Sequence, residues 1–230
     1  MFKRFAIYFA PPEDAPITRQ AAAWLGRDAF RGRPPLPRAA LNGFTEEVWR
    51  VVTADPRVYG FHATLKPPFR LNDSASEPDL FHRLREFALS QRSFEAPFLR
   101  LSTLSSFLAL TLSEPCPAFQ SLAEDCVREF DAFRAPPSEE ELARRRQARL
   151  TARQLEHVER WGYPYVMDEW RFHMTLSSSL ESPLLETIGT HLQDLFAPHC
   201  RGPLIVDSIC LFEQPGAGEP FHERERFLLS

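Results

Sequence analysis

The chain has 230 residues, a formal net charge of −4, and hydrophobic and charged shares of 43% and 25%. This composition excludes a fibrous or disordered chain, and the length suits one large domain or two small lobes that share a core. The acidic balance argues against a protein that coats long nucleic acids, but it leaves nucleotide-sized substrates open.

The N-terminus and the cysteines point to the cytoplasm. The first residues lack the apolar core and cleavage site of a signal peptide, and no apolar run is long enough to span a bilayer. We therefore expect a cytoplasmic protein without a membrane partner. Its four cysteines do not have the spacing of a zinc site, so we expect reduced, mostly buried thiols.

The first predicted elements are a strand and a helix. Residues 4–10 alternate aromatic residues with polar or small ones, which predicts a half-buried strand that ends at Pro11. Apolar residues at helical spacing predict a helix over 14–27. The stretch 31–38 is rich in proline and arginine and is typical of a loop. Thr45 is a suitable cap for a short helix after it.

The middle of the chain predicts alternating strands and helices. The pattern over 59–66 indicates a strand that a Pro-Pro pair ends. A hydroxyl cap followed by proline and acid predicts a helix over about 76–90. We also expect strands near 94–104 and 107–112 and a helix over about 117–133.

Residues 136–160 differ from the rest in their charge density. Ser138 and Glu141 have the spacing of a capping box, which predicts a helix start. The arginines that follow have two interpretations. They form either a solvated helix laced with charge pairs or a basic face for an anionic substrate. Nearby glutamates offset the positive charge and weaken the second interpretation, so we treat the segment as a linker helix.

The last third repeats the order of the first. A strand is expected over 170–177, then a helix that Ser182 and Pro183 open and that runs to about 197, then a last strand over 204–213. Both halves thus contain a strand, a helix, a motif strand, a helix and a strand. We predict a single bilobal domain over 1–230, with lobe-forming halves of about 1–135 and 161–230 joined by the linker helix 136–160.

One tetrapeptide pattern occurs once in each half. The two copies are His62-Ala63-Thr64-Leu65 and His173-Met174-Thr175-Leu176. Alternate residues of a strand share a face, so each copy has an apolar face for the core and a polar face with His beside Thr. The same parity places Lys66 and Arg171 on the polar faces.

Two such faces that meet across a groove would bring two imidazoles and two hydroxyls to one ligand. Imidazole titrates near neutrality, so one copy can accept a proton from water while the other donates one to a leaving alkoxide. Hydroxyls can stabilise the charge that develops on phosphate oxygens. This pattern favours a metal-free opening of a phosphodiester, for which a cyclic phosphate is suited because its leaving oxygen stays tethered.

Two alternatives compete with this hypothesis. A single His-x-Thr-Leu is more often part of an amphipathic strand, with a histidine whose hydrogen bonds are made within the protein. Only the second copy makes the catalytic interpretation the better one. A zinc site would need further ligands, and neither motif has a carboxylate or a second histidine nearby on the same face. We expect no metal and no cofactor.

The paired motifs resemble the signature of the two-histidine (2H) phosphoesterase superfamily, which includes RNA ligase-like cyclic phosphodiesterases. The context over 4–12 and 59–69 is similar to a bacterial branch associated with phosphonate-metabolism gene clusters. The resemblance implies an α+β fold: two pseudo-symmetric lobes of mainly antiparallel sheet, packed with helices around a central groove.

The resemblance also implies roles for particular residues. His62 and His173 would be the acid/base pair, in an order that the sequence does not decide, and Thr64 and Thr175 would hold the phosphate. Strand parity adds Lys66 and Arg171 as substrate-binding residues. Tyr8 could line the groove, although a structural tyrosine is the more common case.

The association with phosphonate breakdown implies a small-molecule substrate, a ribose cyclic phosphate with a further 5-phosphate, which the arginines of the loop Arg31–Arg38 could hold. One alternative is a 2′,3′-cyclic phosphodiesterase that acts on nucleotides or RNA ends. Another is a non-catalytic module that binds a phosphorylated metabolite. We expect no long nucleic acid partner and, by default, a monomer.

Overall fold

The computed structural model describes residues 3–30, 44–139, 141, 143 and 149–230. Within these residues, seven strands form one sheet in the order β4-β5-β6-β2-β1-β8-β9, and all neighbouring strands are antiparallel. A separate ladder joins β3 to β7. The strands are β1 Arg4–Phe9, β2 Ala63–Phe69, β3 Phe94–Ala96, β4 Leu99–Leu104, β5 Phe107–Leu112, β6 Met174–Thr175, β7 Leu204–Val206, β8 Ser208–Gln214 and β9 His222–Leu228.

The described helices lie between these strands along the chain. They are α1 Pro16–Leu25, α2 Glu46–Val52, α3 Ala54–Tyr59, α4 Glu77–Ser90, α5 Pro117–Glu129, α7 Ala152–Trp161 and α8 Leu184–Phe196, with 3₁₀ turns η1 Asp131–Phe133, η2 Met167–Glu169 and η3 Ala197–His199. Two helix starts are capped as the sequence predicts. The side chain of Thr45 accepts from the Val48 amide, and that of Ser76 from the Asp79 amide.

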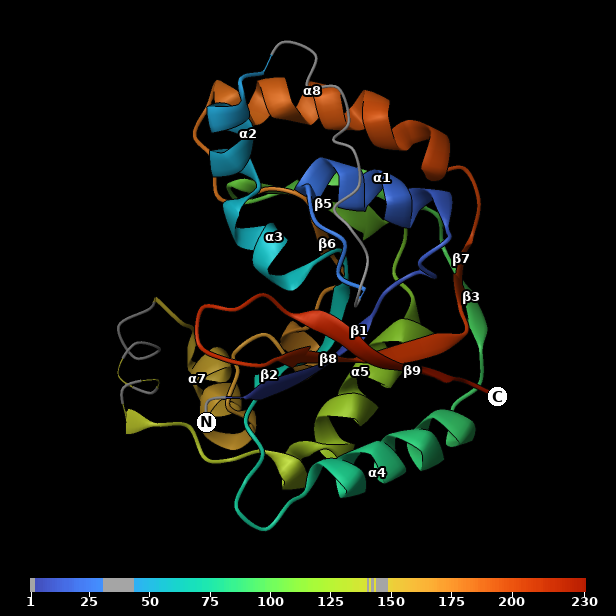
Figure 1. The fold of residues 1–230 in the computed structure, drawn as a ribbon, viewed down its shortest axis with the longest axis vertical. Coiled ribbons are helices and arrows are strands. Elements are labelled where there is room, and N and C mark those ends of the chain that lie inside the picture. Colours follow the sequence, from blue (N-terminus) through green and yellow to red (C-terminus); the bar gives the residue numbers. More distant parts are fainter. Residues whose placement is uncertain (1–2, 31–43, 140, 142, 144–148) are drawn as a thin grey trace.

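The helices cover the sheet in two groups (Figure 1). Helix α8 packs on α1 and on strands β4 and β5, whereas α5 packs on β2 and α4 packs on β9. The apolar side chains of both groups join one continuous core between the helices and the sheet. The α+β fold class with a mainly antiparallel sheet is therefore confirmed.

The two halves of the sequence are interleaved in the sheet. Strand β5 of the first half pairs with β6 of the second, and β1 pairs with β8. Helix α1, from the N-terminal region, packs beside the C-terminal helix α8. The boundary that we expected near 136–160 thus does not divide the sheet, because each half contributes strands to both sides of the β2–β6 junction.

The segment 136–160 is not one continuous helix. Residues 139, 141, 143 and 152–160 are helical, whereas 136–138 and 149–151 are not. The Ser138 amide donates to the Glu141 carboxylate, and the Glu141 amide donates to the Ser138 hydroxyl, which confirms the expected capping box. A second capping box, of Thr151 and Gln154, opens α7. The basic face that we considered falls largely on Arg144, Arg145 and Arg146, which lie outside the described residues. In the described part of the chain, no helix combines the length and the hydrophobicity that spanning a membrane requires.

Several sequence predictions differ from the structure. The first motif strand was expected over 59–66 and was expected to end at the Pro-Pro pair, but Tyr59 ends α3 and β2 runs from Ala63 through both prolines to Phe69. The strand expected over 170–177 has only two residues in the ladder. The Ser182 hydroxyl donates to Glu186 instead of capping α8, whose N-cap is Pro183. Strand β9 was not predicted, because an edge strand with alternating charges lacks the apolar alternation of a buried one.

Candidate functional site

The two motif strands are neighbours in the sheet. Ala63 of β2 pairs with Met174 of β6, and both side chains are buried in the core. Since successive side chains of a strand point to opposite faces, the flanking residues of each motif lie on the other face. These flanking residues, His62, Thr64, His173 and Thr175, all line one cavity of about 330 Å³, which is within the range of small-molecule sites.

The backbone before the first motif fixes the orientation of His62. Gly60 ends α3 with a φ of 80°, and a Cβ on it would lie 2.6 Å from the Cβ of Ala29. The Gly60 carbonyl accepts a hydrogen bond from Nδ1 of His62 at 2.9 Å. Because a carbonyl can only accept, Nδ1 carries the proton and Nε2 is left as an acceptor, 3.2 Å from Oγ1 of Thr64.

The second motif repeats this arrangement. Nδ1 of His173 donates to the carbonyl of Arg171, again two residues earlier, at 2.9 Å. Nε2 of His173 is therefore the nitrogen left for a ligand. Before β6 begins, the indole N–H of Trp170 donates to the Thr64 carbonyl at 2.7 Å, which connects the residues that precede the second motif to β2. The two imidazoles thus share one tautomer and one cavity.

The surroundings of His62 favour its neutral form. Burial lowers the pKa of His62 to about 4, opposed by the hydrogen bond to Gly60 and assisted by the nearby His173. Tyr8 of β1 stacks on the imidazole with ring centroids 3.7 Å apart. Burial, together with Tyr59 and Tyr163, raises the pKa of Tyr8 well above its ordinary value. The Tyr8 phenol at the cavity therefore stays protonated and can donate a hydrogen bond.

The cavity contains one cation that our sequence reasoning missed. Arg4 lines it, and Nε of Arg4 donates to Gln214 at 2.7 Å. A signal was present, because Arg4 shares a strand face with Tyr8. The remaining lining residues are Tyr59, Pro67, Pro68 and Tyr163. Tyr163 comes from the loop after α7, and nothing in the sequence linked it to the motifs.

Lys66 does not reach this cavity. The β1–β2 register is shifted between the pairs Ile7–Lys66 and Tyr8–Thr64, so a bulge breaks the alternation that predicted the position of Lys66. The side chain of Lys66 is buried instead. Its ammonium donates to the Val127 carbonyl at 3.3 Å and lies 3.5 Å from the carboxylate of Asp131. The expected groove-facing lysine is a buried ion-pair partner.

Arg171 is exposed and lines a second, adjoining cavity of about 850 Å³ instead of the histidine cavity. The loop Arg31–Arg38, to which we assigned a phosphate-binding role, lies outside the described residues.

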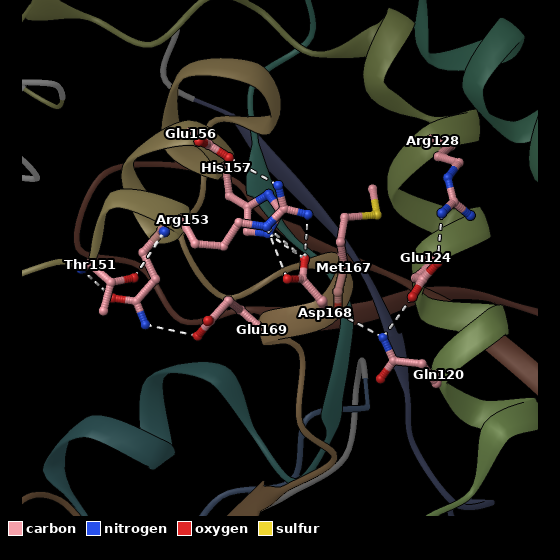
Figure 2. A network of polar contacts seen from close by, with 11 residues as sticks. Gln120, Glu124, Arg128, Thr151, Arg153, Glu156, His157, Met167, Asp168 and Glu169 are labelled. Atoms are coloured by element: carbon pink, nitrogen blue, oxygen red, sulfur yellow. Dashed lines mark hydrogen bonds and ion pairs between the residues drawn. The ribbon is translucent and has the colours of Figure 1, made fainter.

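A network of polar contacts anchors the loop that carries Tyr163 (Figure 2). Arg153 and His157 of α7 both bind the Asp168 carboxylate, with His157 Nε2 2.8 Å from Oδ1. Gln120 of α5 donates to the Met167 carbonyl at 2.7 Å. The hydrogen bond from Arg153 is the main cause that lowers the pKa of Asp168 to about 2. Helices α5 and α7 thereby fix the turn that leads into the second motif.

Known proteins place the chain in a family. Residues 64–222, well over half of the chain, match the model of DUF1045, described as a protein of unknown function. The chain belongs to this family. Two curated relatives carry the name ribose 1,5-bisphosphate phosphokinase PhnN. The protein from Janthinobacterium sp. (strain Marseille) is 38% identical over 99% of this chain and 51% of its own length. The protein from Laribacter hongkongensis (strain HLHK9) is 34% identical over 95% of this chain and 50% of its own length.

The chain therefore spans about half the length of the curated relatives it matches. Among solved structures, E. coli LigT complexed with 3′-AMP is 15% identical, with a TM-score of 0.49 over 99% of this chain and 98% of that chain. A structure described as a phosphoesterase has a TM-score of 0.48 at 15% identity, over 99% of this chain and 98% of that chain.

Proposed function

We propose that this DUF1045 protein is a phosphodiesterase that opens a cyclic phosphate by general acid/base catalysis between His62 and His173, without a metal. The observation that supports this proposal is the shared cavity, to which both motifs contribute an imidazole with its Nε2 free of a backbone partner. Among the described residues, no three His, Cys, Asp or Glu side chains gather as a metal site would need.

His62 is the better choice for the base. Its lowered pKa keeps it neutral, so its Nε2 can accept a proton from water as the water oxygen attacks phosphorus. His173, protonated at Nε2, then donates that proton to the ring oxygen as its bond to phosphorus breaks. The product is an open phosphomonoester with a free hydroxyl. Proton exchange with solvent returns both imidazoles to their starting states.

The other lining residues would stabilise the negative charge that develops on the non-bridging oxygens. Thr64 and Thr175 can donate from their hydroxyls, Tyr8 from its phenol, and Arg4 from the guanidinium nitrogens that Gln214 does not occupy. The groups that a phosphate anion needs, namely hydroxyl donors and a cation, are thus present on the cavity wall.

The names of the relatives support a sugar substrate. Both are named for ribose 1,5-bisphosphate, and this chain matches about half of each. Hydrolysis of the bond between phosphorus and O2 in ribose 1,2-cyclic phosphate 5-phosphate would yield ribose 1,5-bisphosphate. A hydrolase that supplies this compound would fit beside relatives that are named for ribose 1,5-bisphosphate.

The test is to incubate the protein with that sugar and with nucleoside 2′,3′-cyclic phosphates in the presence of a chelator, and to follow the products by phosphorus NMR. We expect ring opening of the sugar with release of ribose 1,5-bisphosphate. Turnover of the nucleotides alone would reject the sugar assignment, and loss of activity with the chelator would reject the metal-independent mechanism.

A second candidate function is a nucleoside 2′,3′-cyclic phosphodiesterase. The observation that favours it is the pair of tyrosines, Tyr59 and Tyr163, on the cavity wall, because aromatic rings can stack on a base. The same substrate panel decides between the two.

A further inference from the structure

The face of the sheet that carries the histidines continues beyond the motif strands. Thr175 of β6 pairs with Ala109 of β5, which pairs with Ser102 of β4. Residues that oppose one another across strands share a face. Thr111, two residues from Ala109, is on that face too, and Arg100 is opposite Thr111. A row of small and hydroxyl side chains thus leads from the proposed catalytic pocket to an arginine.

The far end of this row lines the second cavity, of about 850 Å³. Arg100, Ser102 and Thr111 line it from the sheet, and Arg171 lines it from the segment before the second motif. The hydroxyls of Ser102 and Thr111 are 2.6 Å apart. Because Arg171 is two residues from His173, this segment contributes a side chain to each cavity.

The two arginines are available to a ligand. Both are exposed, and neither side chain makes an ion pair or hydrogen bond with another described residue. Helix α5 begins at Pro117 on the same wall, and its first turn has no acidic residue and no side-chain cap. A helix N-terminus favours an anion. Within the described lining, Glu114 is the only carboxylate, and it is exposed.

We propose that this second cavity is a phosphomonoester subsite, in which Arg100 and Arg171 hold the phosphate on the far side of the sugar from the cyclic phosphate. The proposal rests on the function proposed above and extends it to the substrate's second phosphate. Thr175 and Ser102 are two strand spacings apart, roughly 10 Å, a separation that one pentose with a phosphate at each end can bridge with the help of a long arginine side chain.

The first experiment measures the kinetics of Arg100→Gln and Arg171→Gln. The substrates are ribose 1,2-cyclic phosphate with and without its 5-phosphate. A charge-assisted hydrogen bond to phosphate corresponds to roughly a 10- to 100-fold effect. We expect KM for the 5-phosphorylated sugar to rise by about that factor, with kcat unchanged and with the kinetics of the unphosphorylated sugar unchanged.

Arg92→Gln is the matched control. Arg92 is also exposed, its loss changes the net charge equally, and it lines neither cavity. If the wild type is active and the Arg100, Arg171 and Arg92 variants all have the same KM for the 5-phosphorylated sugar, the subsite is overturned and the proposed reaction is not affected.

A binding experiment separates the subsite from the reaction. Ribose 5-phosphate has no cyclic phosphate, so its affinity by calorimetry does not depend on turnover. We expect wild type and Arg92→Gln to bind it equally and the other two variants to bind it roughly 10- to 100-fold more weakly. This result would support the subsite even if neither cyclic sugar were hydrolysed. Undetectable binding to wild type, or equal binding by all variants, would overturn it.

Discussion

His62 is held in place more by its surroundings than by its own motif. The carbonyl of Gly60 fixes the tautomer, the ring of Tyr8 covers one face, and the position of Gly60 excludes a Cβ. The two-residue spacing of His and Thr could be predicted from the sequence as a shared strand face. The stacking of Tyr8 on His62 could not, because pairing between β1 and β2 is a long-range feature that one sequence does not reveal.

The pH dependence of the reaction follows from the pKa of His62. A base must be deprotonated to act, so a pKa of about 4 predicts that kcat/KM falls only as the pH drops through about 4. A bound phosphate anion favours the charged imidazole and raises this pKa, so the acid limb of kcat should lie at higher pH than that of kcat/KM. Pre-steady-state and steady-state pH profiles check both statements. An acid limb of kcat/KM at pH 6.5 or above would contradict the assignment of His62 as the base.

Strand β2 shows how one irregularity redirects a side chain. The bulge next to Leu65 places Lys66 in the interior, where burial lowers its pKa to about 8 against the opposing effect of Asp131. Simple alternation predicted a substrate-binding lysine, and it failed because a bulge leaves no mark in a single sequence. The charged strand β9 was missed for a related reason, since edge position is decided by the whole sheet.

Lys66 should therefore affect stability and leave catalysis unchanged. Its ordinary pKa of 10.5 applies to the unfolded chain, so between pH 8 and 10.5 the unfolded state binds more protons and the free energy of unfolding rises with pH. Lys66→Met should remove this rise and retain kcat/KM, whereas Lys66→Ala should lower stability by about 3 kcal/mol because it leaves a cavity. Asp131 keeps its ion pair with Arg134 in both variants. Urea unfolding at several pH values is the measurement. A loss of activity in a folded Lys66→Met protein would restore the substrate-binding role.

The interleaved sheet makes the two histidines neighbours. The motifs lie far apart in the sequence, yet β2 and β6 are adjacent in the sheet, with β1 and β8 on one side of the pair and β5 and β4 on the other. The sequence predicted two similar units and a shared groove. It did not predict that α1 would pack beside α8 or that β8 would extend the sheet from β1, because those contacts depend on how apolar faces match in three dimensions.

We therefore propose that residues 1–230 form one cooperative domain. Fragments 1–139 and 149–230, expressed separately, should remain unfolded by circular dichroism, because each lacks pairing strands that the other provides. Expressed together, they should associate and show the signal of a folded sheet. Independent folding of either fragment would indicate two autonomous lobes.

The most direct test of the two-histidine pocket compares His62→Ala, His173→Ala and the double variant on whichever cyclic phosphate the wild type opens. General acid and base roles typically contribute roughly 10²- to 10⁴-fold each, so each single variant should lose at least about 100-fold in kcat while its circular dichroism spectrum and its affinity for inorganic phosphate are retained. A folded single variant that hydrolyses the substrate at the wild-type rate would show that the paired imidazoles do not carry out the reaction.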